Sequence, residues 1–264
     1  MHKDEYRKMF ETEDMHWWFV SLHELICRFA ALEHKRKGSL LLLDAGCGTG
    51  SLCRLLAPYG SITGVDISEP ALAYCCKRGL RNIRQGDLNT DDLGHEQFDI
   101  ITCIDVLYHQ AIGDELLILK KFLTALRPGG SLILNLPAFE FLRSSHDIAV
   151  QTRRRYTKRA VAALLREAGF LVEKSTYRVS LLFPLIALYR LARHKRAAGK
   201  QALAEGSDVW LPPAWINHFL YSIMRLENLY LRHASFPFGS SVFAIGRKPC
   251  DRGKNRLLHG KDQR

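Results

Sequence analysis

Short apolar runs alternate with amphipathic stretches along residues 39–138, and this alternation predicts the fold. The first run, four leucines at 40–43, suits a strand buried on both faces. Strands are predicted at 40–44, 62–66, 82–84, 98–103, 131–136, 171–179 and 241–247, and helices at 51–58, 69–77, 114–126 and 158–168. Repeated strand–helix–strand units indicate an α/β fold: a doubly wound, seven-stranded, mostly parallel sheet that binds ligands at the carboxyl ends of its strands.

Two helical regions lie outside this alternation. Apolar and aromatic positions recur at helical spacing over 4–35, which predicts one helix there and makes 1–38 an N-terminal helical cover. Residues 180–238 form a helical insertion within the sheet domain, 39–248. This insertion is either a hairpin packed on the sheet as a lid, or a contact with a membrane surface through the apolar and then basic segment 181–196.

Composition favours a compact protein in a reducing compartment. With 47% apolar residues among 264, the chain can bury a sizeable core. Its seven cysteines form no CxxC pair, and its charged N-terminus has no apolar segment of the signal-peptide kind. No apolar run reaches the roughly 18 residues that a spanning helix needs. We therefore expect a cytoplasmic protein, with membrane association only through 181–196.

The positive charge belongs to the second half of the chain. Residues 1–140 carry 15 basic and 19 acidic side chains, whereas residues 141–264 carry 23 and 8, including a basic tail at 249–264. Such a field suits nucleic acid, anionic lipid or a phosphorylated substrate. A solvated surface with a loose basic tail explains the same numbers, so charge alone does not choose a partner.

The turn after the first strand carries the clearest chemistry. Glycines stand at alternate positions, Gly46, Gly48 and Gly50, so the backbone can approach a ligand closely. A phosphate-binding P-loop would continue with lysine, but Ser51 follows, which excludes that class. The spacing is GxGxG and differs from the dinucleotide fingerprint GxGxxG. Asp66, about 20 residues beyond the first glycine, suits a carboxylate that accepts both ribose hydroxyls.

Five motifs follow one another in register. They are D-A-G-C-G-T-G at 44–50, G-V-D-I-S at 64–68, G-D-L at 86–88, F-D-I-I-T-C-I-D-V-L-Y-H at 98–109 and L-R-P-G-G-S-L at 126–132. In this order they resemble class I S-adenosylmethionine-dependent methyltransferases, especially the ubiquinone-biosynthesis branch, over about residues 40–138. The resemblance implies a Rossmann-like fold, S-adenosyl-L-methionine as cofactor and S-adenosyl-L-homocysteine as product.

The resemblance also assigns roles to residues. The glycine loop would pass under the methionine part of the cofactor, Asp66 would bind the ribose, and Asp87 would accept from the adenine amino group between Ile67 and Leu88. His16-Trp17-Trp18-Phe19 resembles a segment that folds over the cofactor, but Leu22 stands where relatives often carry arginine. The predicted cofactor-binding residues are Asp44, Gly46, Cys47, Gly48, Gly50, Asp66, Ile67, Asp87, Leu88, Ile104 and Trp18.

Methyl transfer to a hydroxyl benefits from a base, and two places offer one. His109 follows the fourth strand, and His146 lies beside Asp147 on the polar loop 139–156. The same loop carries an arginine triplet, 153–155, which could clamp an anionic acceptor, and then Tyr156. The catalytic candidates are His146, His109, Asp147 and Tyr156. Ordinary packing or turn-capping roles explain each of them equally simply.

The sequence therefore predicts an enzyme, a methyltransferase acting on a small-molecule, sugar or lipid-linked acceptor by in-line O-methylation. No metal-ligand spacing appears, so no metal is expected. No nucleic-acid-binding module is evident, which disfavours a nucleic-acid partner. Two alternatives remain: an RNA or protein methyltransferase that docks through the basic half, and a non-catalytic cofactor-binding scaffold at a membrane surface. The acceptor atom and the oligomeric state stay open.

Overall fold

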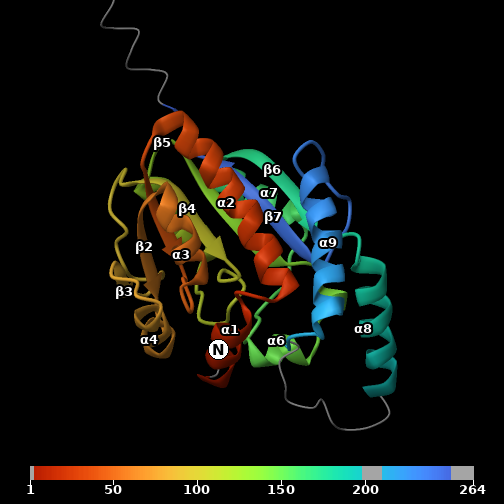
Figure 1. Ribbon diagram of the computed structural model, residues 1–264. Helices are drawn as coiled ribbons and strands as arrows, with labels where there is room; N and C mark the ends of the chain where they lie inside the picture. The colour runs from red at the N-terminus through yellow and green to blue at the C-terminus, as the bar shows by residue number, and fades with distance from the viewer. Residues whose placement is uncertain (1–2, 198–209, 251–264) are drawn as a thin grey trace, which may run out of the picture.

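A seven-stranded sheet forms the centre of the computed structural model, which describes residues 3–197 and 210–250. Its strands are β1 (Leu40–Ala45), β2 (Gly60–Asp66), β3 (Ile83–Gln85), β4 (Phe98–Ile104), β5 (Leu126–Pro137), β6 (Leu171–Arg178) and β7 (Ser241–Arg247). They are arranged in the order β3-β2-β1-β4-β5-β7-β6 (Figure 1). Strands β1 to β5 pair in parallel, and β7 runs antiparallel to both of its neighbours. The mostly parallel α/β sheet predicted from the sequence is confirmed.

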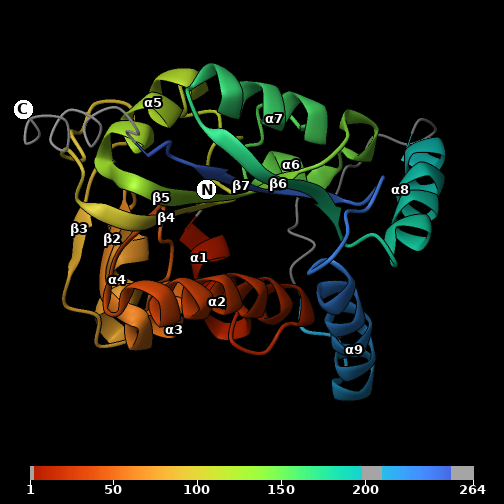
Figure 2. The same cartoon turned by 90° about the horizontal axis from the view of Figure 1, so that it is seen from above.

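Helices cover both faces of this sheet. They are α1 (Lys3–Thr12), α2 (Trp17–Lys37), α3 (Ser51–Leu56), α4 (Glu69–Lys77), α5 (Glu115–Ala125), α6 (Ser145–Ala149), α7 (Lys158–Glu167), α8 (Phe183–Ala197) and α9 (Ala214–Tyr230), with 3-10 turns η1 (Ala57–Tyr59) and η2 (Glu140–Leu142). Figure 2 shows α5 and α7 on one face and α2, α3 and α4 on the other. The three-layer arrangement follows from strands that are apolar on both sides.

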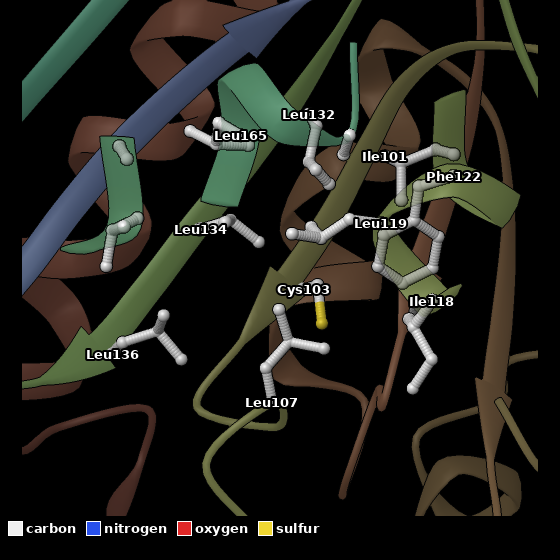
Figure 3. Close-up of a cluster of buried hydrophobic side chains, with 14 of the residues drawn as sticks. Ile101, Cys103, Leu107, Ile118, Leu119, Phe122, Leu132, Leu134, Leu136 and Leu165 are labelled. Carbon is white, nitrogen blue, oxygen red and sulfur yellow. The ribbon is translucent and has the colours of Figure 1, made fainter. Parts of the chain in front are cut away.

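Consecutive residues of the central strands enter two different cores. On one face, Ile101 and Leu132 pack with Phe122 of α5 and Leu165 of α7 (Figure 3). The preceding residue of β4, Ile100, joins the core that α2 and α3 cover. This two-sided packing holds the carboxyl ends of the central strands in fixed positions, as close-packed interiors do.

The single N-terminal helix predicted over 4–35 is wrong, because the chain breaks between α1 and α2. The side chain of Glu13 turns to the glycine loop, where it bonds Thr49 and Arg78. His16 then caps α2, since its Nδ1 accepts from the backbone N–H of Trp18 at 3.3 Å. The helical periodicity continues across this break, which is why the sequence pattern does not show it.

The loop 139–156 is also more ordered than a polar connector. It contains η2 and the short helix α6, which begins with a capping box between Ser144 and Asp147. Figure 1 shows α6 at the same end of the molecule as α1. The loop therefore lies at the end of the sheet where β1 ends at Ala45 and β2 ends at Asp66.

The insertion packs mainly against the N-terminal cover. Figures 1 and 2 show α9 beside α2. Asn217 Oδ1 accepts from the backbone N–H of Trp17 at 2.9 Å, and Asn228 Nδ2 donates to the carbonyl of Ser21 at 2.7 Å. Parts of two predicted regions, 198–209 of the insertion and 251–264 of the tail, lie outside the described residues. No described helix combines the length and apolar character needed to cross a membrane.

Candidate active site

The glycine loop after β1 has the backbone that its sequence predicts. Gly46, Gly48 and Gly50 have φ angles of +84°, +52° and +84°, a region that side chains rarely tolerate. A Cβ on Gly46 would also collide with the side chain of Val106, which follows β4. The loop is anchored to β2, because Gly46 N–H donates to the carbonyl of Val65 at 2.7 Å. It forms a cradle of exposed backbone that only glycine allows.

Asp66 ends β2 directly beside this cradle. Its Oδ2 accepts from Gly48 N–H at 2.8 Å, and its Oδ1 accepts from Ser68 N–H at 2.9 Å. Only 8% of the residue is exposed, and burial raises the pKa of its carboxyl above the usual range. The two backbone donors hold the carboxylate at the carboxyl edge of the sheet, where the sequence places it.

Asp44 lies beneath the loop rather than in it. Its Oδ1 accepts from Thr102 Oγ1 at 2.7 Å, and its Oδ2 accepts from the thiol of Cys53 at 3.4 Å. Burial raises the pKa of Asp44 to about 6. Cys47 is buried in a small cluster with Cys53 and Cys75. Through these contacts Asp44 and Cys47 stabilise the conformation of the loop from beneath. We call Asp44, Gly46, Gly48 and Asp66 the cofactor cluster.

Helix α1 lies across this cluster. Tyr6 is buried, and Asp66 is among the charges that raise the pKa of its hydroxyl, although burial is the larger cause. The methyl carbon of Met9 lies 2.8 Å from the position that a Cβ on Gly48 would take. A ligand on the loop would therefore lie under α1, between this helix and the sheet.

A group of charges fixes the end of α1 to the loop. Arg78 donates to Glu13 Oε1 and to Asp14 Oδ2, both at 2.7 Å, and Ser51 Oγ donates to Asp14 at 2.6 Å. Burial raises the pKa of Glu13 to about 7, although Thr49 and Arg78 act in the opposite direction. We call Glu13, Asp14 and Arg78 the α1 latch.

The residues predicted to hold the adenine are only partly arranged for it. Asp87 forms a turn, since its Oδ1 accepts from Asn89 N–H at 2.9 Å, which leaves Oδ2 to meet a ligand. Ile67 is 54% exposed near this position, whereas Leu88 is buried in the main core. Ile104 ends β4 and Trp18 is half-buried between two cores. Their roles toward a ligand stay predictions.

The predicted bases lie at the same end of the sheet. His109 Nδ1 accepts from Ala111 N–H at 3.0 Å, and burial lowers the pKa of His109. His146 is half-buried on α6. Tyr156 is buried, and its hydroxyl donates to Glu115 at 2.7 Å, which together with burial raises the tyrosine's pKa. This hydroxyl is already engaged in the fold.

The arginine triplet does not form the free anion clamp that the sequence suggests. Arg155 is an ion pair with the buried Asp147, whose Oδ1 lies 2.8 Å from its Nε, and this pair lowers the pKa of Asp147 against the effect of burial. Arg153 and Arg154 both pair with the buried Glu115. Sequence spacing cannot reveal these partners, because Glu115 lies almost 40 positions away.

Three further polar residues gather where β4, β5 and β6 end. None of them is among the site residues predicted from the sequence. Asn135 Nδ2 donates to Asp105 Oδ2 at 3.0 Å. Arg178 is fully buried and interacts electrostatically with Asp105. We call Asp105, Asn135 and Arg178 the acceptor-side cluster. The one sign of this cluster in the sequence is Asp105, an acidic residue that directly follows the fourth strand within the motif at 98–109.

Other parts of the described chain offer less. No group of three His, Cys, Asp or Glu side chains within the described ranges could hold a metal ion. A hollow of about 500 Å³ lies near the amino ends of β1, β2 and β4, lined by residues that include Ser61, Thr63 and Gly94. It contains none of the candidate residues, so the chemistry belongs to the opposite edge of the sheet.

The sheet order, the antiparallel β7 and the glycine cradle with its acidic neighbour define a class of protein. Residues 43–134 match the family described as "Methyltransferase domain". Within these residues the chain carries a methyltransferase domain, and its sheet order and glycine loop agree with the class I S-adenosylmethionine-dependent kind. S-adenosyl-L-methionine is the cofactor of this class, and the loop fits it, since its three positive-φ glycines place no side chain between the backbone and a ligand, and the Asp66 carboxylate is held beside them.

A more particular relationship comes from the curated proteins. The ubiquinone biosynthesis O-methyltransferase of Haemophilus ducreyi is 29% identical over 156 residues, which are 51% of this chain and 65% of that protein. The chain thus matches less than two thirds of that relative's length.

Solved structures share the fold at lower identity. A Haloferax volcanii methyltransferase, solved with the Trm112 methyltransferase activator, has a TM-score of 0.55 and 17% identity over 93% of this chain and 94% of that one. Haemonchus contortus phosphoethanolamine N-methyltransferase 2, solved with S-adenosyl-L-methionine, has a TM-score of 0.51 and 20% identity over 84% of this chain and 52% of that one. These likenesses establish the architecture alone.

Proposed function

We propose that this protein transfers the methyl group of S-adenosyl-L-methionine to a hydroxyl of a small-molecule, sugar or lipid-linked acceptor. The observation that carries the proposal is the glycine loop with its cofactor cluster, where three left-handed glycines lie beside the fixed carboxylate of Asp66 and next to α1. The cofactor supplies an activated methyl group with a neutral leaving group. The protein then has to align the acceptor in line with that methyl group and exclude water.

Each cofactor contact is assigned to a residue of this chain. The backbone of the glycine loop would lie under the methionine part, and Asp66 would accept from the ribose hydroxyls. Asp87 Oδ2 would accept from the adenine amino group beside Ile67. Ile104 and Trp18 would contact the cofactor from β4 and α2. Charge-assisted hydrogen bonds of this kind contribute about 1.5–3 kcal/mol each, so the Asp66 contact should dominate affinity.

Two features support a small acceptor. Helix α1 and the loop 139–156 lie at the end of the sheet that carries the glycine loop, and Met9 of α1 reaches Gly48 (Figure 1). The curated relative is named as a ubiquinone biosynthesis O-methyltransferase. His146 and His109 lie near this end as the candidate bases from the sequence, whereas Asp147 pairs with Arg155 and the Tyr156 hydroxyl donates to Glu115. An RNA or protein acceptor would instead need an open basic face.

A membrane contact is a second proposal, and exposed apolar side chains favour it. Leu185 and Leu188 of α8 are 67% and 68% exposed, and Trp215 and Phe219 of α9 are 74% and 62% exposed. Apolar and aromatic side chains of this kind, near basic residues, suit the interface of an anionic bilayer. Flotation with anionic but not neutral liposomes would support the contact, and its loss in Trp215→Ser and Phe219→Ser would localise it.

The function is tested in two steps. Calorimetry should first show binding of S-adenosyl-L-methionine to the purified protein, and its absence would reject the assignment. Transfer of labelled methyl groups into polar, lipid, RNA and protein fractions of a bacterial extract then identifies the acceptor. Label in the polar or lipid fraction supports the proposal. Label in RNA or protein, with binding that weakens steeply in salt, would support the alternative instead.

A further inference from the structure

Asp105 stands in a backbone conformation that needs an explanation. Its φ is +55°, in the left-handed region that residues other than glycine seldom adopt. Its N–H donates to the carbonyl of Asn135 at 2.9 Å, so the neighbouring strand β5 holds it in this conformation. Strained residues persist where the surroundings fix them, and they concentrate at functional sites.

This residue lies next to the glycine loop. It follows Ile104 at the carboxyl end of β4, and the next side chain, Val106, packs directly against Gly46. The conformation turns the chain at the point where the sheet ends and the loop begins. Asp105 is half-buried, so part of its surface faces outward from the core. It is therefore placed beside the methyl donor's cradle and within reach of a second ligand.

Asn135 holds the carboxylate in position from behind. Its Nδ2 lies 3.0 Å from Asp105 Oδ2 and 3.2 Å from Oδ1. Asn135 is fully buried, and its own amide oxygen has no hydrogen-bond partner among the described residues. Among the described residues, the side-chain amide of Asn135 therefore hydrogen-bonds only to the Asp105 carboxyl.

Arg178 adds a positive charge that acts on the same carboxyl. Its Nη2 donates to Ser21 Oγ at 3.0 Å, while Nε and Nη1 make no hydrogen bond to the described residues. Its electrostatic partners are Asp105 and Glu227. The oxygens of Glu227 already accept from the backbone N–H groups of Val179, Ser180 and Leu181. Asp105 is thus the carboxylate whose charge can change in response to Arg178.

We propose that Asp105 is the general base of the active site, that it takes the proton of an acceptor hydroxyl, and that Asn135 and Arg178 are positioning residues. The inference rests on the proposed function and names its acceptor group. The acceptor oxygen passes its proton to the Asp105 carboxylate as it bonds to the methyl carbon. The carbon–sulfur bond breaks with both electrons going to sulfur, and the proton later leaves to water.

The electrostatics suit this role. Burial raises the pKa of Asp105 to about 7, whereas Asn135, Arg178 and Arg155 act to lower it. A base with a pKa near the working pH is the most effective one. Besides the two arginines, the titratable groups that interact with it are Tyr108 and Cys103, and burial raises the pKa of both above the neutral range. Neither of these two neighbours changes its charge near pH 7, so Asp105 is the group that does so among them.

The test compares Asp105→Asn with His146→Ala, the rival base, and with Asp92→Asn, an exposed control. All three should bind S-adenosyl-L-methionine within about threefold of the wild type. In transfer of labelled methyl to the extract fraction that accepts it, Asp105→Asn should lower kcat by about 10²–10⁴-fold with little change in KM. His146→Ala should lower it by less than about tenfold. The rising limb of the pH–rate profile near 7 should disappear only in Asp105→Asn.

The carboxyl itself gives a readout that needs no acceptor. Carbon NMR of the S-adenosyl-L-homocysteine complex should show Asp105 titrating near 7, and Arg178→Met should move this titration to higher pH, because it removes a cation that favours the ionised form. Arg178→Lys keeps a positive charge and should return the titration part of the way toward that of the wild type. The lysine variant also replaces the methionine variant in this test if the latter does not fold. A titration in the ordinary aspartate range would overturn the inference.

Other outcomes separate this inference from the proposed function. If the wild type binds no S-adenosyl-L-methionine, the proposed function fails. If the wild type methylates an acceptor and Asp105→Asn does so equally well, only the inference fails. Loss of cofactor binding in Asp105→Asn would make Asp105 a cofactor ligand instead, and a large loss of kcat in His146→Ala alone would make His146 the base.

Discussion

The two polar clusters at the carboxyl end of the sheet are built differently. In the cofactor cluster backbone donors close in sequence hold Asp66, such as Gly48 N–H, 18 positions away, although side chains hold Asp44. The acceptor-side cluster joins side chains from the ends of three strands, and its Arg178 bonds a residue 157 positions away. In this second cluster, Arg178 keeps two buried donor nitrogens without partners among the described residues. A cofactor site is thus prepared locally, and an acceptor site depends on the whole fold.

The largest effect should come from Glu227, which supports the acceptor side. Glu227→Ala leaves three backbone N–H groups of residues 179–181 without this acceptor, two of them in the buried residues Val179 and Ser180. We expect the free energy of unfolding in urea to fall by roughly 3–5 kcal/mol. The exposed Glu167→Ala should change it little. Equal stability of the two variants would mean that the acceptor side does not depend on this carboxylate.

Next in size is the loss of cofactor affinity in Asp66→Ala. Removing a carboxylate that accepts from two ribose hydroxyls should weaken S-adenosyl-L-methionine binding by roughly 100-fold or more, measured by calorimetry. Glu69→Ala, an exposed acidic neighbour, is the matched control. If Asp66→Ala binds the cofactor as tightly as the wild type, Asp66 is not a cofactor ligand, and the distinction between the two clusters fails.

A smaller effect is expected at the α1 latch, which belongs to the cofactor side but bridges distant segments. Arg78→Ala leaves Glu13 buried without its cation, so α1 should open more often. Amide hydrogen exchange in α1 should speed up by about tenfold, while exchange in β4 and β5 stays unchanged. Exchange that rises equally across the whole sheet would mean that Arg78 supports global stability instead.

Stability should also depend on pH through the acceptor side. The pKa of Asp105 rises from an ordinary value of 3.8 to about 7 on folding. The native state therefore retains the proton, and stability is lost as pH rises from about 4 to about 7. Asp105→Asn should lack this component, so its unfolding free energy relative to the wild type should rise over that window. A parallel pH dependence of both proteins would contradict the buried carboxyl.

Much of the architecture could be predicted because it rests on local patterns. The four leucines at 40–43 predict a strand buried on both faces, and β1 lies in the sheet between β2 and β4. The start of β7 at Ser241 and the limits of α4 at Glu69 and Lys77 agree with the predicted bounds. The break before α2 could not be predicted, because Glu13 leaves the helix to bond Thr49 and Arg78 far along the chain.

The candidate site divides in the same way. Gly46, Gly48 and Asp66 are visible in the sequence because a glycine turn and the end of the next strand have fixed spacing. His146 beside Asp147 looked like a catalytic pair, but Asp147 pairs with Arg155. Asp105 was passed over, because neither its left-handed backbone nor the cation behind it leaves a mark in neighbouring residues.

By itself, then, the sequence determined the sheet, the cofactor loop and the class of chemistry, since apolar periodicity and glycine spacing act over a few residues. Only the tertiary structure decided which charges are paired, how α1 covers the loop, and which carboxylate stands beside it. Those outcomes depend on desolvation, on the hydrogen bond between Asp105 and Asn135, and on the charge of Arg178, which come from separate parts of the sheet. Burial and partnership are properties of the folded chain, and no linear pattern records them.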